Sequence, residues 1–79
     1  MRVRVKLFDI FCDFFPPGTK GPEFWLELQE AAKPKDIFAR LKIPDNLQKS
    51  IKCNGRVAKE YQVLQDGDEV AIFSPITGG

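Results

Sequence analysis

Histidine is absent from the 79 residues, and the chain has only two cysteines, Cys12 and Cys53. Without histidine the sequence lacks the commonest general base and metal ligand, which argues against a Ser-His-Asp triad and an ordinary zinc site. Two cysteines are too few for the disulfide framework that small secreted domains use to supplement a small core. We therefore expect a cytoplasmic protein that binds no metal and is not itself an enzyme.

Long apolar runs and an excess of one charge are also missing. Twelve basic residues balance eleven acidic ones, and the two signs alternate along the chain, so no nucleic-acid-binding or membrane-binding surface is expected. The first six residues alternate charged and apolar side chains, unlike a secretory signal or a membrane-spanning helix. A chain this short buries only about 60% of its unfolded surface, so we expect one domain, residues 1–79, that acts through its surface or an end.

Alternating and helical patterns predict the elements of this domain. Residues 2–8 and 23–29 alternate apolar and polar side chains, which is typical of half-buried strands. Residues 9–15 predict a short helical turn that the Pro16-Pro17-Gly18 segment ends. Residues 34–41 predict the main helix, because Ile37, Phe38 and Leu41 share one face.

The second half predicts a hairpin and a central strand. Asn54-Gly55 favours a tight turn within residues 50–58, and the turn at residues 66–68 precedes an apolar strand at residues 69–73. This order predicts an α+β fold with one helix across one face of the sheet. If the first and last strands pair, they run parallel and occupy the middle of the sheet.

The last six residues, 74–79, predict a flexible C-terminal tail. Pro75 ends the strand, and Gly78-Gly79 disfavours regular structure. Neither glycine has a Cβ atom, so the terminal carboxylate can enter a narrow channel of a partner. A carboxylate is a poor electrophile and needs activation, most simply as an acyl-adenylate. A terminal diglycine alone is a weak signal, because ends of chains often fray.

The diglycine stands in a longer motif. Residues 66–79, DGDEVAIFSPITGG, closely resemble the C-terminus of the small subunit of molybdopterin synthase, in the ubiquitin-like sulfur-carrier family that also includes the thiamine-pathway carrier. Val3 to Phe8 is similar to the family's first strand, and Cys53-Asn54-Gly55 lies where its hairpin is expected. The resemblance implies a β-grasp fold.

The resemblance also implies a reaction cycle. An E1-like enzyme uses ATP to adenylate Gly79, and a sulfur donor protein converts it to a thiocarboxylate. The large synthase subunit, in a heterotetramer, then receives the tail, and the sulfur passes to the pterin precursor of the molybdenum or tungsten cofactor. The chain itself binds no cofactor.

We expect partner contacts on the sheet face away from the helix and along the tail. If Val70 and Ile72 face the helix, then Phe73 points to the opposite face, where Phe8 and Val57 can join it. The alternative is that Phe8 and Phe73 are core residues of a thin domain. In the tail, the resemblance implies contacts by Pro75, Ile76 and Thr77.

Other roles for this fold remain open from the sequence. A carrier of the same kind can serve thiamine or cysteine synthesis or tRNA thiolation, and a ubiquitin-like modifier forms isopeptide bonds to target lysines. The Phe-Ser-Pro-Ile-Thr-Gly-Gly ending favours the synthase subunit.

Overall fold

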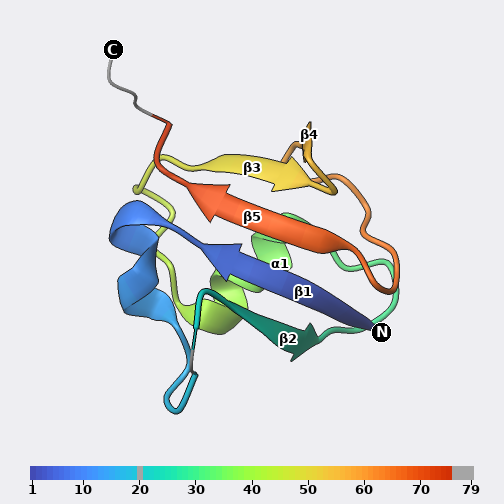
Figure 1. Ribbon diagram of the computed structural model, residues 1–79. Coiled ribbons are helices and arrows are strands. Elements are labelled where there is room, and N and C mark those ends of the chain that lie inside the picture. The colour runs from blue at the N-terminus through green and yellow to red at the C-terminus, as the bar shows by residue number, and fades with distance from the viewer. Residues whose placement is uncertain (20, 76–79) are drawn as a thin grey trace.

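A mixed five-stranded sheet forms one layer of the molecule. The computed structural model describes residues 1–19 and 21–75. The strands follow the order β2-β1-β5-β3-β4 across the sheet, as Figure 1 shows. Their bounds are β1, Arg2–Leu7; β2, Glu23–Glu27; β3, Ser50–Cys53; β4, Arg56–Val57; and β5, Glu69–Phe73.

The first and last strands lie side by side in the middle of the sheet. β1 pairs with β5 in parallel, with Val5 opposite Val70, and β2 pairs with β1 in the antiparallel sense. β5 also pairs with β3 in the antiparallel sense. The predicted parallel pairing is thus confirmed, and β5 is hydrogen-bonded on both edges, which makes it a rigid base for whatever follows Phe73.

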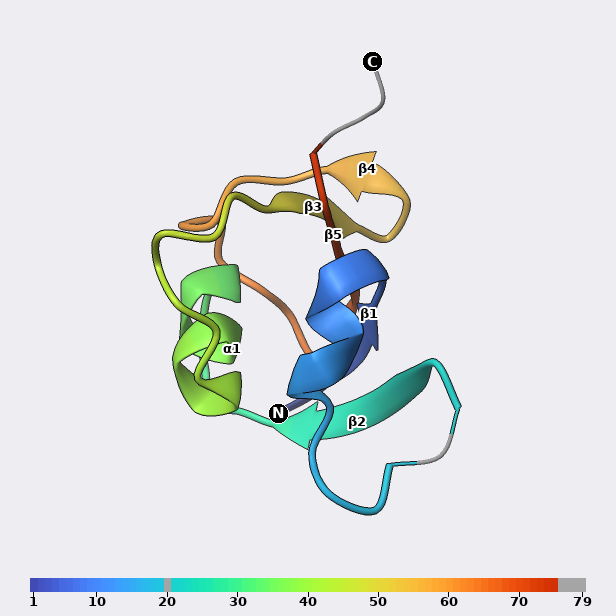
Figure 2. The ribbon, with the colours of Figure 1, turned by 90° about the vertical axis from the view of Figure 1, so that its left-hand side faces the viewer.

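In the part of the chain that the structure describes, the helices lie on one face of the sheet, as the side view in Figure 2 shows. The α-helix α1 spans Pro34–Leu41, and the 3-10 helix η1 spans Asp9–Phe14. Pro34 occupies the first turn of α1, where its missing N–H costs no hydrogen bond. Asp36 accepts a hydrogen bond from the Lys33 N–H (2.8 Å), and Lys42 ends the helix in a left-handed conformation (φ 60°).

The core fills the space between the sheet and these helices. Alternation in β1 places Val3, Val5 and Leu7 inside, and β5 contributes Val70 and Ile72. Ile37 and Phe38 from α1 and Phe11 from η1 complete the contact. These side chains are at most 3% exposed, so one apolar cluster holds both layers together.

Two turns close the strands as the sequence predicts. Asn54 and Gly55 both have positive φ (52° and 84°), which the turn between β3 and β4 requires. Before β5, Asp66 Oδ1 accepts from the Arg2 N–H (2.8 Å), and the Gly67 N–H donates to Arg2 O (2.8 Å). These bonds fix the start of β5 against β1.

The ends of two predicted strands differ from the structure. β1 ends at Leu7 rather than residue 8, because Asp9 takes a positive φ (55°) and η1 begins. β2 ends at Glu27 rather than residue 29, although Leu28 still donates to Met1 O (2.8 Å). The α+β, β-grasp architecture with one main helix is confirmed. No helix in residues 1–19 or 21–75 is long and apolar enough to cross a membrane.

Candidate functional site

The exit of β5 is where the sequence predicts chemistry. Phe73 is the last residue of β5 and is partly buried, Ser74 is partly buried, and Pro75 is exposed. The other predicted tail residues, Ile76, Thr77, Gly78 and Gly79, lie outside the described residues. The structure therefore describes the base of the tail and the surface around it.

The face of the sheet opposite α1, called here the outer face, carries the three predicted contact residues. Phe8 donates its N–H to Ile72 O (3.0 Å) and so lies beside Phe73, with 40% of its surface exposed. Val57 is 81% exposed and faces the same way, because its cross-strand partner Lys52 pairs in turn with Ala71. We call Phe8, Val57 and Phe73 the tail-side patch.

The tail-side patch is not one continuous apolar surface. Phe8 and Phe73 are neighbours, but Lys52 lies between Phe73 and Val57, with its Nζ 5.8 Å from the centre of the Phe73 ring. Such a contact is an ordinary cation–π arrangement. The structure thus brings Phe8 and Phe73 together and leaves Val57 as a separate apolar point across a lysine.

The other half of the outer face is charged and internally neutralised. Arg4 lies 2.5 Å from Glu69 and 3.6 Å from Glu23, and Lys6 lies 3.3 Å and 3.7 Å from the same two carboxylates. Hydrogen bonds from Arg4 and then Lys6 hold the pKa of Glu69 below its ordinary value. Because each of these four charges lies close to an opposite one, together they produce little net electrostatic potential to attract a charged partner.

Trp25 caps this charged region at the sheet edge. The guanidinium carbons of Arg2 and Arg4 lie 4.9 Å and 5.7 Å from its ring centroid, and half of its surface is exposed. Both distances fit cation–π contacts.

Two features near the tail were not predicted from the sequence. Asp9 Oδ2 accepts a hydrogen bond from the Ser74 N–H (3.1 Å), which ties the first residue after β5 to η1. Ile10, in η1 two residues after Phe8, is 53% exposed. An acidic residue directly after an alternating strand was the available signal for Asp9, but its partner 65 residues away could not be read from the pattern.

The cysteines do not form a reactive pair. Cys53 is buried, and burial, together with the Asp68 carboxylate, raises its pKa to about 11. Its thiol is therefore protonated near neutral pH and is a poor nucleophile. Cys12 is exposed, and its Sγ donates to Leu7 O at 3.4 Å. Among residues 1–19 and 21–75 no three His, Cys, Asp or Glu residues gather as a metal site.

Comparisons with known proteins give the same fold. The putative molybdopterin converting factor, subunit 1, from Pyrococcus furiosus is 27% identical with a TM-score of 0.71, covering 95% of this chain and 98% of that one. SAMP1 from Haloferax volcanii is 20% identical with a TM-score of 0.73, covering 100% of both chains.

A further match comes from a protein–protein complex of subunits 1 and 2 of the Helicobacter pylori molybdopterin-converting factor, 24% identical with a TM-score of 0.61 over 100% of both chains. No curated protein sequence shows significant similarity. The model of the ThiS family, however, matches residues 14–79. The chain therefore belongs to the ThiS family, a family of ubiquitin-like sulfur carriers.

Proposed function

We propose that this chain is the sulfur-carrying small subunit of a molybdopterin synthase. The observation that carries the proposal is the 27% identity to the putative molybdopterin converting factor, subunit 1, across 95% of the chain, within a family of sulfur carriers. The ending after β5, Ser-Pro-Ile-Thr-Gly-Gly, supports it, because an unhindered terminal carboxylate suits activation by another protein.

The chemistry proceeds on Gly79 in two steps, both catalysed by partners. An E1-like enzyme joins the Gly79 carboxylate to the α-phosphate of ATP, which forms the acyl-adenylate and releases pyrophosphate. A sulfur nucleophile at the oxidation level of sulfide, delivered by a donor protein, attacks the carbonyl carbon and displaces AMP. The product is a Gly79 thiocarboxylate, and no electron is transferred.

Sulfur transfer follows in the large synthase subunit. The thiocarboxylate sulfur attacks a side-chain carbon of the pterin precursor and displaces an oxygen substituent, which leaves with its bonding electron pair. Water then attacks the Gly79 carbonyl carbon and breaks its bond to sulfur, so that sulfur stays on the pterin and Gly79 returns to a carboxylate. The tail contacts the channel of the large subunit through Pro75, Ile76, Thr77 and Gly78 as it enters. The folded domain acts as the handle that holds the tail.

The geometry of the described residues supports such docking. β5 is paired on both edges, and the Asp9–Ser74 hydrogen bond orients the chain as it leaves the sheet. Phe8 and Phe73 offer a desolvatable aromatic pair beside this exit, and aromatic anchors commonly dominate interface energetics. We therefore assign the tail-side patch to the large subunit.

Intact-mass measurement tests the first half of the proposal. After incubation with an E1-like enzyme, ATP and a sulfide source, the chain should gain about 16 Da as sulfur replaces oxygen. A Cys12→Ser, Cys53→Ser variant should show the same gain, which separates a thiocarboxylate from a cysteine persulfide at about 32 Da. A ladder of protein conjugates instead of this gain would identify a modifier and overturn the proposal.

Reconstitution tests the second half. The thiocarboxylated chain, mixed with the large subunit and the pterin precursor, should yield the dithiolene product in proportion to the carrier supplied. A chain lacking Gly79 should give no mass gain and no product while melting at the same temperature. If the thiocarboxylate forms but its sulfur is transferred only in thiamine synthesis, cysteine synthesis or tRNA thiolation, the protein is a sulfur carrier of another pathway and the molybdopterin assignment is wrong.

A further inference from the structure

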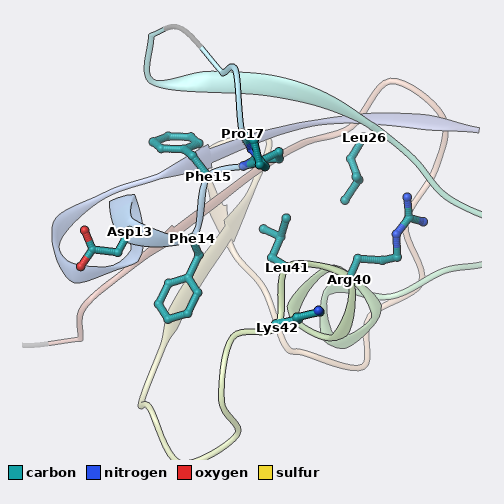
Figure 3. A pocket seen from close by; sticks show the side chains of 9 residues that line it. Asp13, Phe14, Phe15, Pro17, Leu26, Arg40, Leu41 and Lys42 are labelled. Carbon is teal, nitrogen blue, oxygen red and sulfur yellow. The ribbon is translucent and has the colours of Figure 1, made fainter.

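A groove of 460 Å³ lies on the helix side of the molecule, away from the tail-side patch. Phe15 and Pro17 form one wall of the groove, and Leu26 from β2 and Leu41 from α1 also line it, as Figure 3 shows. All four are at least partly exposed, so the groove offers apolar surface to a ligand.

The first wall is held in place by aromatic packing. Phe15 packs edge-on against Phe24 of β2, with ring centroids 5.7 Å apart, and Phe14 lies 6.5 Å from the buried Phe11 ring. These contacts anchor the start of the Phe-Phe-Pro-Pro-Gly segment to the core. The groove is therefore bounded by fixed side chains, and the diglycine chemistry makes no use of it.

Charge is distributed unevenly along the groove. Arg40 and Lys42, at the C-terminal end of α1, are both exposed and line it, whereas Asp13 lies toward its other end (Figure 3). Within residues 1–19 and 21–75, neither cation forms an ion pair with a carboxylate. Arg40 Nη1 donates to Glu27 O (3.0 Å), which holds the guanidinium beside β2 with other N–H groups still available.

The groove runs beside an open strand edge. β2 is the last strand of the sheet on this side. Leu28 and Met1 form a hydrogen-bonded pair through both of their backbone groups (2.8 and 2.9 Å). Hydrogen-bonded pairs occur at every second residue of an antiparallel ladder, so the backbone N–H and C=O of Leu26 also point toward β1. The backbone N–H and C=O of Trp25 therefore point away from the sheet, where an added strand can pair with them.

We propose that this edge and groove together bind an extended segment of a partner protein, in which an aliphatic residue is followed by acidic residues. The segment runs parallel to β2 and pairs with the Trp25 backbone, which directs its alternate side chains to the helix side. There the aliphatic side chain enters between Leu26 and Leu41. Its C-terminal acidic residues then reach the Glu27 end of β2, where Arg40 lies. The acidic residues meet Arg40 and Lys42, and Asp13 disfavours the reversed direction.

This surface is independent of the proposed sulfur chemistry. It lies on the layer opposite the tail-side patch, so a carrier docked through Phe8 and Phe73 leaves it accessible. A second protein can thus recognise the domain without competing for the tail.

Nuclear magnetic resonance titration tests the proposal. The isotope-labelled full chain receives a synthetic peptide of about ten residues, alternating valine or isoleucine with serine and ending in glutamates. Amide shifts are expected at Phe14, at Phe15 and at residues 24–27 and 40–42. A matched peptide ending in lysines should bind at least about tenfold more weakly.

Charge-reversal variants locate the site. Arg40→Glu combined with Lys42→Glu should weaken peptide binding about tenfold or more, whereas Lys35→Glu combined with Lys59→Glu, an equal charge change elsewhere, should have little effect. Equal weakening by both pairs, equal binding of the lysine peptide, absence of shifts, or shifts confined to Phe8 and Phe73 would each overturn the proposal.

Discussion

Val57→Asp separates the role of the tail-side patch in binding from its role in folding. Val57 is 81% exposed, so only about a fifth of its surface is removed from water by folding. Full burial of a valine contributes about 1.5–3 kcal/mol, and this fraction corresponds to about 0.3–0.6 kcal/mol. The lower strand propensity of aspartate adds up to about 1 kcal/mol.

The net cost to folding should remain small. The new carboxylate faces Lys52, the cross-strand partner of Val57. Opposite charges on cross-strand partners stabilise a sheet, so this pair offsets part of the lost stability. The free energy of unfolding should therefore fall by no more than about 1.5 kcal/mol. Urea denaturation of the wild type and the variant measures this difference.

Binding should respond much more strongly. In a complex that covers the tail-side patch, the substitution places a charge against apolar partner surface, and the dissociation constant for the large synthase subunit should rise at least about tenfold. Isothermal titration calorimetry gives this constant. Tyr61→Asp is the control, because Tyr61 is 64% exposed and lies next in sequence to Glu60, whose carbonyl accepts the Lys35 N–H of α1.

Unchanged affinity in Val57→Asp would remove β4 from the interface and leave only Phe8 and Phe73 as contacts. Equal losses in Val57→Asp and Tyr61→Asp would point to a general effect of negative charge. Either result would refute the assignment of Val57 to the docking surface.

Three further predictions follow from the same structure. Phe73→Asp should abolish large-subunit binding by calorimetry while circular dichroism shows a folded chain, since Phe73 lies outside the buried core; an unfolded variant would place it in the core. Acid should destabilise the protein below about pH 4.5, because the pKa values of Glu69 and Asp68 are lower in the folded state than in the unfolded state. Their contribution to the free energy of unfolding is complete above the unfolded-state pKa values and is lost as the pH falls through the folded-state values. The melting temperature of Glu69→Gln should therefore depend less on pH than that of the wild type. Phe11→Ala should lower the unfolding free energy by about 3–5 kcal/mol in urea, and a loss below about 1 kcal/mol would contradict its full burial.

The regular elements were predictable because local chemistry determines them. Alternation in residues 2–8 correctly placed Val3, Val5 and Leu7 inside, and helical spacing gave α1 with its observed bounds. Asn54-Gly55 fixed the hairpin, because positive φ at both positions suits few other residues.

The surroundings of the tail were less predictable, because they depend on contacts between distant residues. The Asp9–Ser74 hydrogen bond requires the parallel pairing of β1 and β5 to exist first. Lys52 interrupts the tail-side patch only because the β3 register places it opposite Ala71, from where its side chain reaches the Phe73 ring. The groove under Leu41 likewise requires Phe15 to reach Phe24, a contact that no periodicity reveals.

The division of the outer face gives the domain a preferred docking end. Near β2, four charges neutralise one another, so a partner that covered them would lose their solvation without gaining a new ion pair. Near the exit of β5, Phe8 and Phe73 offer apolar side-chain surface, and the charge beside them, on Lys52, lies against the Phe73 ring and is in no ion pair among the described residues. A partner therefore gains most by binding over the exit of β5, which is also where it must bind to receive the residues that follow Pro75.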